Sequence, residues 1–257
     1  MSHIPEPPLA GRSVLVTGAS SGIGRAIAVA CAHAGATVVL TYRRNEAGAR
    51  EVEHQIKALG RHVAVIQADV AEETSIQSLA VAARTAVGSI DAWVNNAGAD
   101  ILTGSAATLS DVAKLDLLLA VDLRGTMLAS WCAAEMLGAQ PDGGVIVNMS
   151  WDHVVTGMAG RNPELFAAVK GGVLAFSKSL ARSVAPRVRV NVVAPGWIDT
   201  SFAAGIDQRR RSVVAESTPL KRWGTPDDVA GAVVYLISPA AAFVTGQTLF
   251  IGGGTVM

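Results

Sequence analysis

The sequence is poor in charged residues and in cysteine. Charged residues make up 16% of its 257 residues, against ~25% in an average soluble domain, and the formal net charge is zero. Without a basic field, the protein is not expected to bind nucleic acid or an acidic membrane surface. Its two cysteines, Cys31 and Cys132, lie in apolar helical patterns and match no metal-ligand spacing. We therefore expect buried thiols and no metal site.

Long hydrophobic runs are also missing. No uninterrupted apolar run approaches the roughly 18 residues of a membrane helix, and the N-terminal "MSHIPEPPLAG" lacks the charged-then-apolar pattern of a signal peptide. We expect a soluble cytoplasmic protein whose residues 1–10 are flexible. No linker, internal repeat or low-complexity segment divides the chain, which is long enough for one large core. Residues 1–257 are therefore expected to form a single domain.

Short β-branched runs alternate with Ala-rich segments of helical length. Runs that are apolar on both faces and separated by helical crossovers are typical of a parallel sheet covered on both sides. The sequence therefore predicts an α/β fold, a single doubly wound Rossmann-like domain with a mostly parallel seven-stranded sheet and helices on both faces. In such a sheet, ligands bind beyond the carboxyl ends of the strands. The predicted strands cover residues 13–17, 36–42, 62–67, 90–94, 144–150, 188–195 and 246–253.

The segment "TGASSGIG" follows the first predicted strand and opens a helix. Its glycines allow a tight turn and let a phosphate approach backbone N–H groups at the positive end of the helix. A glycine turn can also serve sterics alone, so its meaning depends on the loops that follow. The residues expected to bind a dinucleotide here are Gly18, Ser20, Ser21, Gly22, Ile23 and Gly24.

The end of the second predicted strand decides between NAD and NADP. A site that prefers NAD places an acid there to hold the ribose 2′-hydroxyl. This strand ends in Tyr42, and Arg43 and Arg44 follow. Guanidinium groups pair well with a 2′-phosphate, so we expect NADP(H) as the cofactor. The alternative is that the two arginines form only a solvated helix start.

With these segments, the chain resembles the short-chain dehydrogenase/reductase family over nearly its whole length. "TGASSGIG" matches the family's T-G-x-x-x-G-x-G motif, "NNAG" at 95–98 its fourth-strand motif, and "PGWIDT" at 195–200 its nicotinamide-side motif. The C-terminal segments resemble those through which the family forms dimers and tetramers, which implies a homo-oligomer. The resemblance implies that Asp69 and Val70 contact the adenine and that Lys170 binds the nicotinamide ribose. The residues that it implies along the cofactor are Asn95, Ala97 and Gly98. Those that it implies on the nicotinamide side are Pro195, Gly196, Ile198 and Thr200.

The catalytic half departs from the family. Its Tyr-x-x-x-Lys pair, in which the lysine charge lowers the phenol pKa, here reads Phe166 and Lys170. The only tyrosines are Tyr42, at the adenosine end, and Tyr235, in a C-terminal helix, so neither is expected to reach a nicotinamide ring. The family's asparagine, which kinks the fourth helix, aligns with Asp122, which we expect to pair with Lys170.

The family's serine is also replaced. Counting along the fifth strand puts Trp151 in its place, with Ser150 on the opposite face, whereas counting back from Phe166 puts His153 there. We favour the strand count because loops absorb insertions. A histidine titrates near neutral pH, so His153 is a candidate proton donor, although a loop histidine is more often a surface residue. Adjacent residues usually point to different sides, so Asp152 is not by itself its partner.

Other residues keep two interpretations. Asp122 is a candidate general acid or base, although an ion pair is its simpler use. Trp151, Trp197 and Met158 form either an apolar substrate wall or part of the core. Residues 200–217 are expected to be a substrate lid, with Arg209 to Arg211 either solvated or facing an acidic group such as a CoA phosphate.

Three functions remain open from the sequence. The favoured one is an NADP(H)-dependent oxidoreductase that reduces the C=O or C=C bond of a small or acyl substrate with a non-standard proton donor. The second is a catalytically silent NADP(H)-binding subunit or sensor. The third is a non-redox lyase or isomerase on the same scaffold.

Overall fold

A computed structural model of the chain describes residues 6–257. Half of the N-terminal segment expected to be flexible, residues 1–5, lies outside the described residues. In the other half, the Leu9 side chain is fully buried, and its N–H donates to the Ala34 carbonyl at 2.9 Å. The apolar side chain of Leu9 therefore anchors this part of the segment to the core.

One sheet organises the fold, and every strand pair in it is parallel. Its strand order is β3-β2-β1-β4-β5-β6-β7, so the chain leaves the β3 edge and returns to β4 on the far side of β1. This reversal is the topological switch point at which doubly wound folds bind ligands. The strands confirm the predicted runs and are β1 (Ser13–Val16), β2 (Thr37–Tyr42), β3 (Val63–Gln67), β4 (Ala92–Asn95), β5 (Gly144–Met149), β6 (Val188–Pro195) and β7 (Thr248–Ile251).

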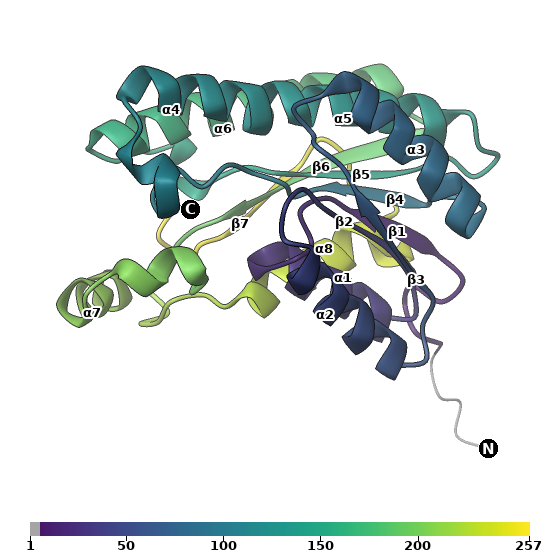
Figure 1. The fold of residues 1–257 in the computed structure, drawn as a ribbon, viewed down its shortest axis with the longest axis horizontal. Helices are drawn as coiled ribbons and strands as arrows, with labels where there is room; N and C mark the ends of the chain where they lie inside the picture. Colours follow the sequence, from purple (N-terminus) through teal and green to yellow (C-terminus); the bar gives the residue numbers. More distant parts are fainter. Residues whose placement is uncertain (1–5) are drawn as a thin grey trace.

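Helices cover both faces of the sheet, as predicted (Figure 1). Side chains alternate along each strand, so Val14 and Val16 enter one core while Leu15 enters the other. The first core lies under α1 (Gly22–His33), α2 (Glu46–Ala58) and α8 (Pro226–Ile237). The second lies under α3 (Glu73–Val87), α5 (Gly125–Gly138) and α6 (Arg161–Val184), with α4 (Asp111–Leu118) packed on α6.

A π-helical turn, Leu119–Arg124, joins α4 to α5 and gives one continuous helical stretch, Asp111–Gly138. This stretch is long and apolar enough to cross a membrane, with a mean hydropathy of 1.3 in its most apolar window. The core helix of a soluble protein passes the same test, and α5 packs against the sheet, so the stretch is weak evidence for a membrane span.

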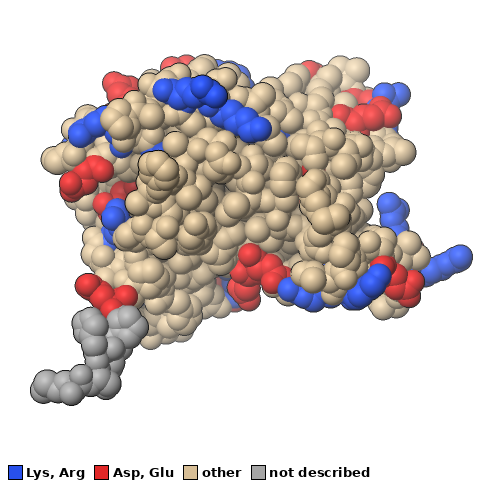
Figure 2. Space-filling model, turned by 180° about the vertical axis from the view of Figure 1, so that it is seen from behind, with Lys and Arg blue, Asp and Glu red and all other residues tan. Residues whose placement is uncertain are grey.

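Shorter elements gather at the carboxyl ends of the strands. They include the 3-10 turns Gly104–Thr108, Asp152–Val154 and Ser201–Gly205, followed by α7 (Gln208–Ser217), which projects from the body of the fold (Figure 1). The face seen in Figure 2 is largely free of charged side chains, as the composition predicts. Of the two cysteines, Cys31 is fully buried, and burial raises the pKa of its thiol to about 12, whereas Cys132 is only half-buried.

Candidate active site

The glycine turn after β1 is built for close approach. Gly18 and Gly22 have φ angles of +63° and +54°, which favour glycine. A Cβ on Gly18 would lie 2.8 Å from the Ala97 Cα, and one on Gly24 would lie 2.3 Å from the Gly18 carbonyl oxygen. Glycine is therefore required at these positions to pack the turn against the loop after β4.

The helix that follows the turn has an open N-terminus. The Ser21 side chain at its N-cap makes no capping hydrogen bond, and its first turn contains no acidic residue. The first N–H groups of α1 and its positive dipole end are thus left available to an anion. On the far side, the loop after β6 approaches the turn, since a Cβ on Gly22 would lie 3.8 Å from Thr200 Cγ2. The turn fits the phosphates of a dinucleotide.

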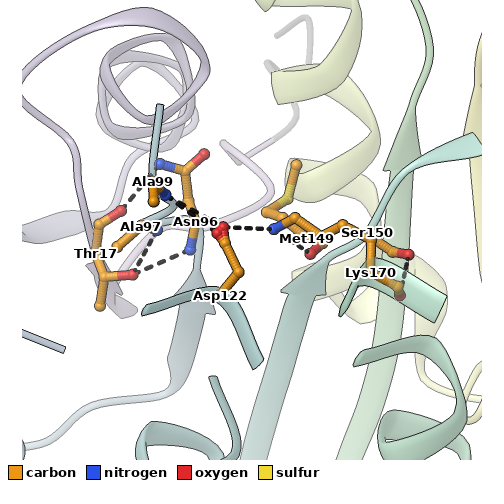
Figure 3. A network of polar contacts seen from close by, with 8 residues as sticks. All are labelled: Thr17, Asn96, Ala97, Ala99, Asp122, Met149, Ser150 and Lys170. Atoms are coloured by element: carbon orange, nitrogen blue, oxygen red, sulfur yellow. Dashed lines mark hydrogen bonds and ion pairs between the residues drawn. The ribbon is translucent and has the colours of Figure 1, made fainter. Parts of the chain in front are cut away.

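Two residues that sequence reasoning missed hold the glycine turn in place (Figure 3). The Thr17 hydroxyl accepts hydrogen bonds from the Asn96 and Ala97 N–H groups, both at 3.0 Å. The Asn96 side-chain amide donates to the carbonyls of Thr17 and Gly18, at 3.0 and 3.1 Å. Strand alternation was the signal that could have found Asn96, because its neighbour Asn95 faces the interior.

Asn95, which was expected to line the cofactor, has its side chain in the interior. This side chain is buried; it accepts from Trp93 Nε1 at 2.8 Å and donates to Asn148 Oδ1 at 2.8 Å and to Ser130 Oγ at 3.0 Å. Asn148 in turn donates to Ser177 Oγ at 2.9 Å. Asn95 therefore ties β4 to β5, α5 and α6 beneath the site, in a buried network whose polar groups are satisfied by one another.

A pocket of about 400 Å³ lies beyond β2 and β3, where the adenosine end of a dinucleotide was expected. Arg43, Arg44 and Asp69 line it, together with Gln67, Ala68 and Ser75. Arg43 Nη1 lies 3.7 Å from Asp69 Oδ2, while Arg44 forms no ion pair within residues 6–257. Val70 is buried and packs against Gly125, the first residue of α5. The structure thus brings the two arginines together with Asp69, whereas Val70 is not among the residues that line this pocket.

Lys170 and Asp122 form the expected ion pair. One helical turn after Phe166 on α6, Lys170 Nζ lies 3.7 Å from Asp122 Oδ1 and donates to the Met149 carbonyl at 3.3 Å. Asp122 sits in the π-helical turn, where both of its oxygens accept from the Ala99 N–H at 3.1–3.2 Å (Figure 3). Such turns are frequent at functional sites, and this one aims a helical side chain at the loop after β4.

The Asp122 carboxyl is almost completely buried. Burial raises its pKa above the ordinary value, while the charge of Lys170 and the N–H of Ala99 oppose that change. A Cβ on Gly98 would lie 3.2 and 3.3 Å from the two carboxylate oxygens. The predicted cofactor-lining glycine therefore also leaves room for this carboxylate.

Ser150, Trp151 and His153, the residues considered for the position of the family's serine, have different surroundings. Ser150 is buried, and its hydroxyl donates to the Lys170 carbonyl at 2.8 Å, so this side chain faces α6, as the strand count expects. Trp151 stacks on His153, with ring centroids 5.0 Å apart and an angle of 23° between the planes. Neither tyrosine supplies a phenol here, since Tyr42 ends β2 and Tyr235 lies on α8, across the sheet from α6.

Asp152 and His153 are in direct contact despite being neighbours in sequence. A 3-10 turn, Asp152–Val154, bends the backbone so that His153 Nδ1 lies 2.5 Å from Asp152 Oδ1. Asp152 is fully buried, and burial raises its pKa, opposed by the hydrogen bond and charge of His153. Its second oxygen, Oδ2, has no hydrogen-bond partner within the described residues. A Cβ on Gly196 or Gly252 would lie only 2.4 or 2.3 Å from that oxygen, so these glycines make room for the carboxylate.

Trp151 and Trp197, which were expected to form either an apolar substrate wall or part of the core, belong to a series of aromatic contacts. Trp151 contacts Phe166 edge-on at 6.3 Å between centroids, and Trp197 contacts His153 at 6.4 Å. Trp197 also contacts Trp223 at 5.4 Å. Met158 is half-buried in the loop before α6. Of the arginines of α7, Arg209 and Arg210 are exposed.

The nicotinamide-side loop after β6 has one buried anchor. Ile198 is buried and forms an isolated parallel bridge with Gly224, which fixes the loop against the segment before α8. Thr200 begins the segment that leads into α7. The predicted residues of this loop therefore lie between the glycine turn and the aromatic rings.

Known proteins resemble this chain both in sequence and in structure. A family model described as enoyl-(acyl carrier protein) reductase matches residues 18–256. An uncharacterised oxidoreductase of Methylorubrum extorquens is 39% identical over 253 residues, covering 96% of this chain and 98% of that protein. The solved structure of a short-chain dehydrogenase from Burkholderia cenocepacia in complex with NADP is similar, with a TM-score of 0.86, 35% identity and coverage of 96% and 99%. A 7α-hydroxysteroid dehydrogenase complexed with NADH and 7-oxo glycochenodeoxycholic acid gives a TM-score of 0.88, 29% identity and coverage of 100% and 98%.

Proposed function

The chain belongs to the short-chain dehydrogenase/reductase family of oxidoreductases, and from this premise we propose that it uses NADP(H) to reduce a C=O or C=C bond, with His153 as the proton donor. The contact between His153 and Asp152 carries the proposal. An ionised Asp152 accepts a hydrogen bond from Nδ1–H, and in the protonated ring Nε2 then carries the proton that the substrate receives. His153 remains partly exposed, whereas Asp152 is wholly buried, so only the histidine can meet a ligand.

The residues present fit a dinucleotide. The glycine turn and the N-terminus of α1 would hold the pyrophosphate, and Lys170 would hold the nicotinamide ribose hydroxyls. Arg44 supports the choice of NADP(H), because a guanidinium without a carboxylate partner beside this pocket suits a 2′-phosphate. Bound NADPH supplies a hydride, and the remaining chemistry belongs to the protein.

Because Phe166 replaces the family's tyrosine, a different group of this chain must supply the proton. When a hydride reaches a C=C bond next to a carbonyl, negative charge develops on the substrate and is quenched by protonation. His153 can supply that proton without a phenol at the carbonyl oxygen. Asp122 has both oxygens engaged and is almost fully buried, so we assign it to the Lys170 ion pair rather than to proton transfer.

A second candidate is a silent NADP(H)-binding subunit. It is favoured by the combined replacement at Phe166, Trp151 and Asp122, which removes three groups of the family's pattern while the cofactor half remains. Its prediction is NADPH binding without oxidation of any substrate.

A cytoplasmic homo-oligomer is also proposed. Trp131 on α5 is half exposed and meets Phe176 of α6 edge-on, with centroids 5.8 Å apart. A large aromatic pair on a weakly charged surface suits burial against a second copy.

The test combines binding with one turnover. NADPH affinity is measured by fluorescence, and the protein–NADPH complex is then mixed with enones, enoyl thioesters and ketones while absorbance at the reduced nicotinamide band is followed. Oxidation with at least one class supports the reductase. Tight NADPH binding with no oxidation by any class would overturn it and support the silent subunit.

A further inference from the structure

Five rings form a continuous series, which we call the aromatic row: Phe166, Trp151, His153, Trp197 and Trp223. Successive centroids lie 5.0–6.4 Å apart, within the range of favourable aromatic contacts. Trp223 is buried, whereas the other four rings are only partly buried, so each of these four keeps some exposed surface, although Phe166 and Trp197 also pack against small core clusters.

The row is assembled from four segments that are distant in sequence. Phe166 comes from α6, Trp151 and His153 from the loop after β5, Trp197 from the loop after β6, and Trp223 from the segment before α8. Its two ends mark functional positions of the proposed site. Phe166 lies one helical turn from Lys170, and Trp223 Nε1 donates to the Arg211 carbonyl of α7, the helix of the proposed lid, at 2.9 Å.

Charge along the row is already neutralised. Arg211 lies over the Trp223 ring at 5.0 Å, but its guanidinium pairs with Asp199 at 2.7 Å and donates to the Ala203 carbonyl at 3.1 Å. Asp152 is buried behind His153. Among the described residues, the only cation recorded against a ring of the row is Arg211, which is already paired, so a carboxylate or phosphate on the row would lose water with little compensation, whereas a flat apolar ring would lose little.

We propose that the aromatic row is the substrate-stacking surface and that the substrate is an uncharged, flat ring compound, namely an aromatic or fused-ring ketone or enone. This inference rests on the proposed function for the bond that reacts. A ketone bound on the row gains a hydride from NADPH at carbon and a proton from His153 at oxygen, giving an alcohol and NADP⁺. An enone gains the hydride at its β-carbon and the proton at its α-carbon.

The competing substrate is a linear acyl thioester. Arg209 and Arg210 of α7 are exposed and form no ion pair within the part of the chain that the structure describes, so they are the groups that would meet CoA phosphates. The two substrate classes therefore depend on different residues, and substitutions separate them.

The test compares β-tetralone and benzylideneacetone with acetoacetyl-CoA and crotonyl-CoA, using Trp197→Leu, which removes the ring, and Trp197→Phe, which keeps one. For the ring compounds we expect Trp197→Leu to raise KM about tenfold with kcat within about threefold, and Trp197→Phe to stay within about threefold in both. With β-tetralone as substrate, Arg209→Gln/Arg210→Gln is expected to leave KM unchanged. The inference is overturned if the thioesters are preferred and depend on the two arginines, or if both Trp197 variants behave alike.

Measuring substrate binding without turnover tests this inference independently of the proposed function. If no compound oxidises NADPH, calorimetric titration of the NADPH-loaded protein with β-tetralone still tests the row. Binding that is weakened about tenfold in Trp197→Leu supports it, and absence of binding contradicts it. Trp151→Leu and Trp151→Phe provide the same comparison if Trp197→Leu does not fold, with thermal melting and NADPH affinity as checks on each variant.

Discussion

Removing Lys170 should leave a buried carboxylate without its counter-charge. The Lys170→Met variant keeps the length and apolar stem of the side chain but removes the ammonium group 3.7 Å from Asp122 Oδ1. At that separation, with the effective permittivity of ~20 that suits protein charges, the attraction is about 4 kcal/mol. Since burial offsets part of it, we expect Lys170→Met to lower the free energy of unfolding by about 3 kcal/mol near pH 8.

The same loss should depend on pH and on Asp122. Burial already raises the Asp122 pKa, and removing Lys170 removes the largest influence that lowers it. A carboxyl with a raised pKa in the folded state stabilises the protein below its unfolded pKa, and this stability is lost as pH rises through the folded pKa. Stability of Lys170→Met should therefore fall between pH 5 and pH 8, with a slope of at most ~1.4 kcal/mol per pH unit.

The control is the double variant Asp122→Asn/Lys170→Met, which has no carboxylate to leave unpaired. Its loss of unfolding free energy should be about 2–3 kcal/mol smaller than the sum of the losses of the two single variants. It should also lack the pH dependence of Lys170→Met. Urea unfolding followed by tryptophan fluorescence, without cofactor, measures these quantities. An equal loss for Lys170→Met at pH 5 and pH 8, unchanged by Asp122→Asn, would refute the reasoning.

Three further predictions concern the choice of cofactor, the contact of Asp152 that orients His153, and the tyrosine hydroxyl that Phe166 lacks. Arg43→Ala/Arg44→Ala should weaken NADPH by about 10–100-fold but NADH by less than about threefold in fluorescence titrations, since only NADPH carries the 2′-phosphate; equal weakening would contradict the assignment. Gly252→Ala should slow single turnover by at least about tenfold with NADPH affinity retained, because its Cβ would lie 2.3 Å from Asp152 Oδ2 and displace the carboxylate that orients His153. Gly231→Ala is its matched control, with no atom within 4 Å of the added methyl on α8, and should keep full activity and gain up to ~1 kcal/mol; equal losses in both variants would exclude the steric explanation. Phe166→Tyr should raise ketone reduction by less than about tenfold in steady-state assays, because Asp122 already compensates the Lys170 charge that would otherwise lower the phenol pKa; a gain above about a hundredfold would show that the lysine is not compensated.

The sheet could be predicted because its signal is local and repeated. Runs such as "VVLTY" and "VIVNM" are apolar on both faces, and only a strand buried between two helical layers makes use of that pattern. The glycine turn could be predicted for a similar reason, since its φ angles and close packing demand glycine at fixed spacings. The pairing of Asp122 with Lys170 followed from the alignment of Asp122 with the family's asparagine, and the structure places Lys170 Nζ 3.7 Å from Asp122 Oδ1.

The contact between Asp152 and His153 could not be predicted from such patterns. Whether Asp152 and His153 meet depends on a single 3-10 turn, which neither a period of two nor one of 3.6 reveals. The space that Asp152 occupies depends on Gly196 and Gly252, which directly follow β6 and β7. The buried hydrogen bonds of the Asn95 side chain were not predicted either, because the family motif implied only that this residue lines the cofactor.

The role of His153 is the central claim, and the rate of a single turnover tests it most directly. NADPH-loaded wild type and His153→Gln are mixed with the same reducible substrate, and nicotinamide oxidation is followed across pH in H₂O and D₂O. We expect His153→Gln to bind NADPH as wild type does, to react about 10²–10⁴-fold more slowly, and to lose the solvent isotope effect. A His153→Gln rate within about threefold of wild type, with the isotope effect unchanged, would contradict the account.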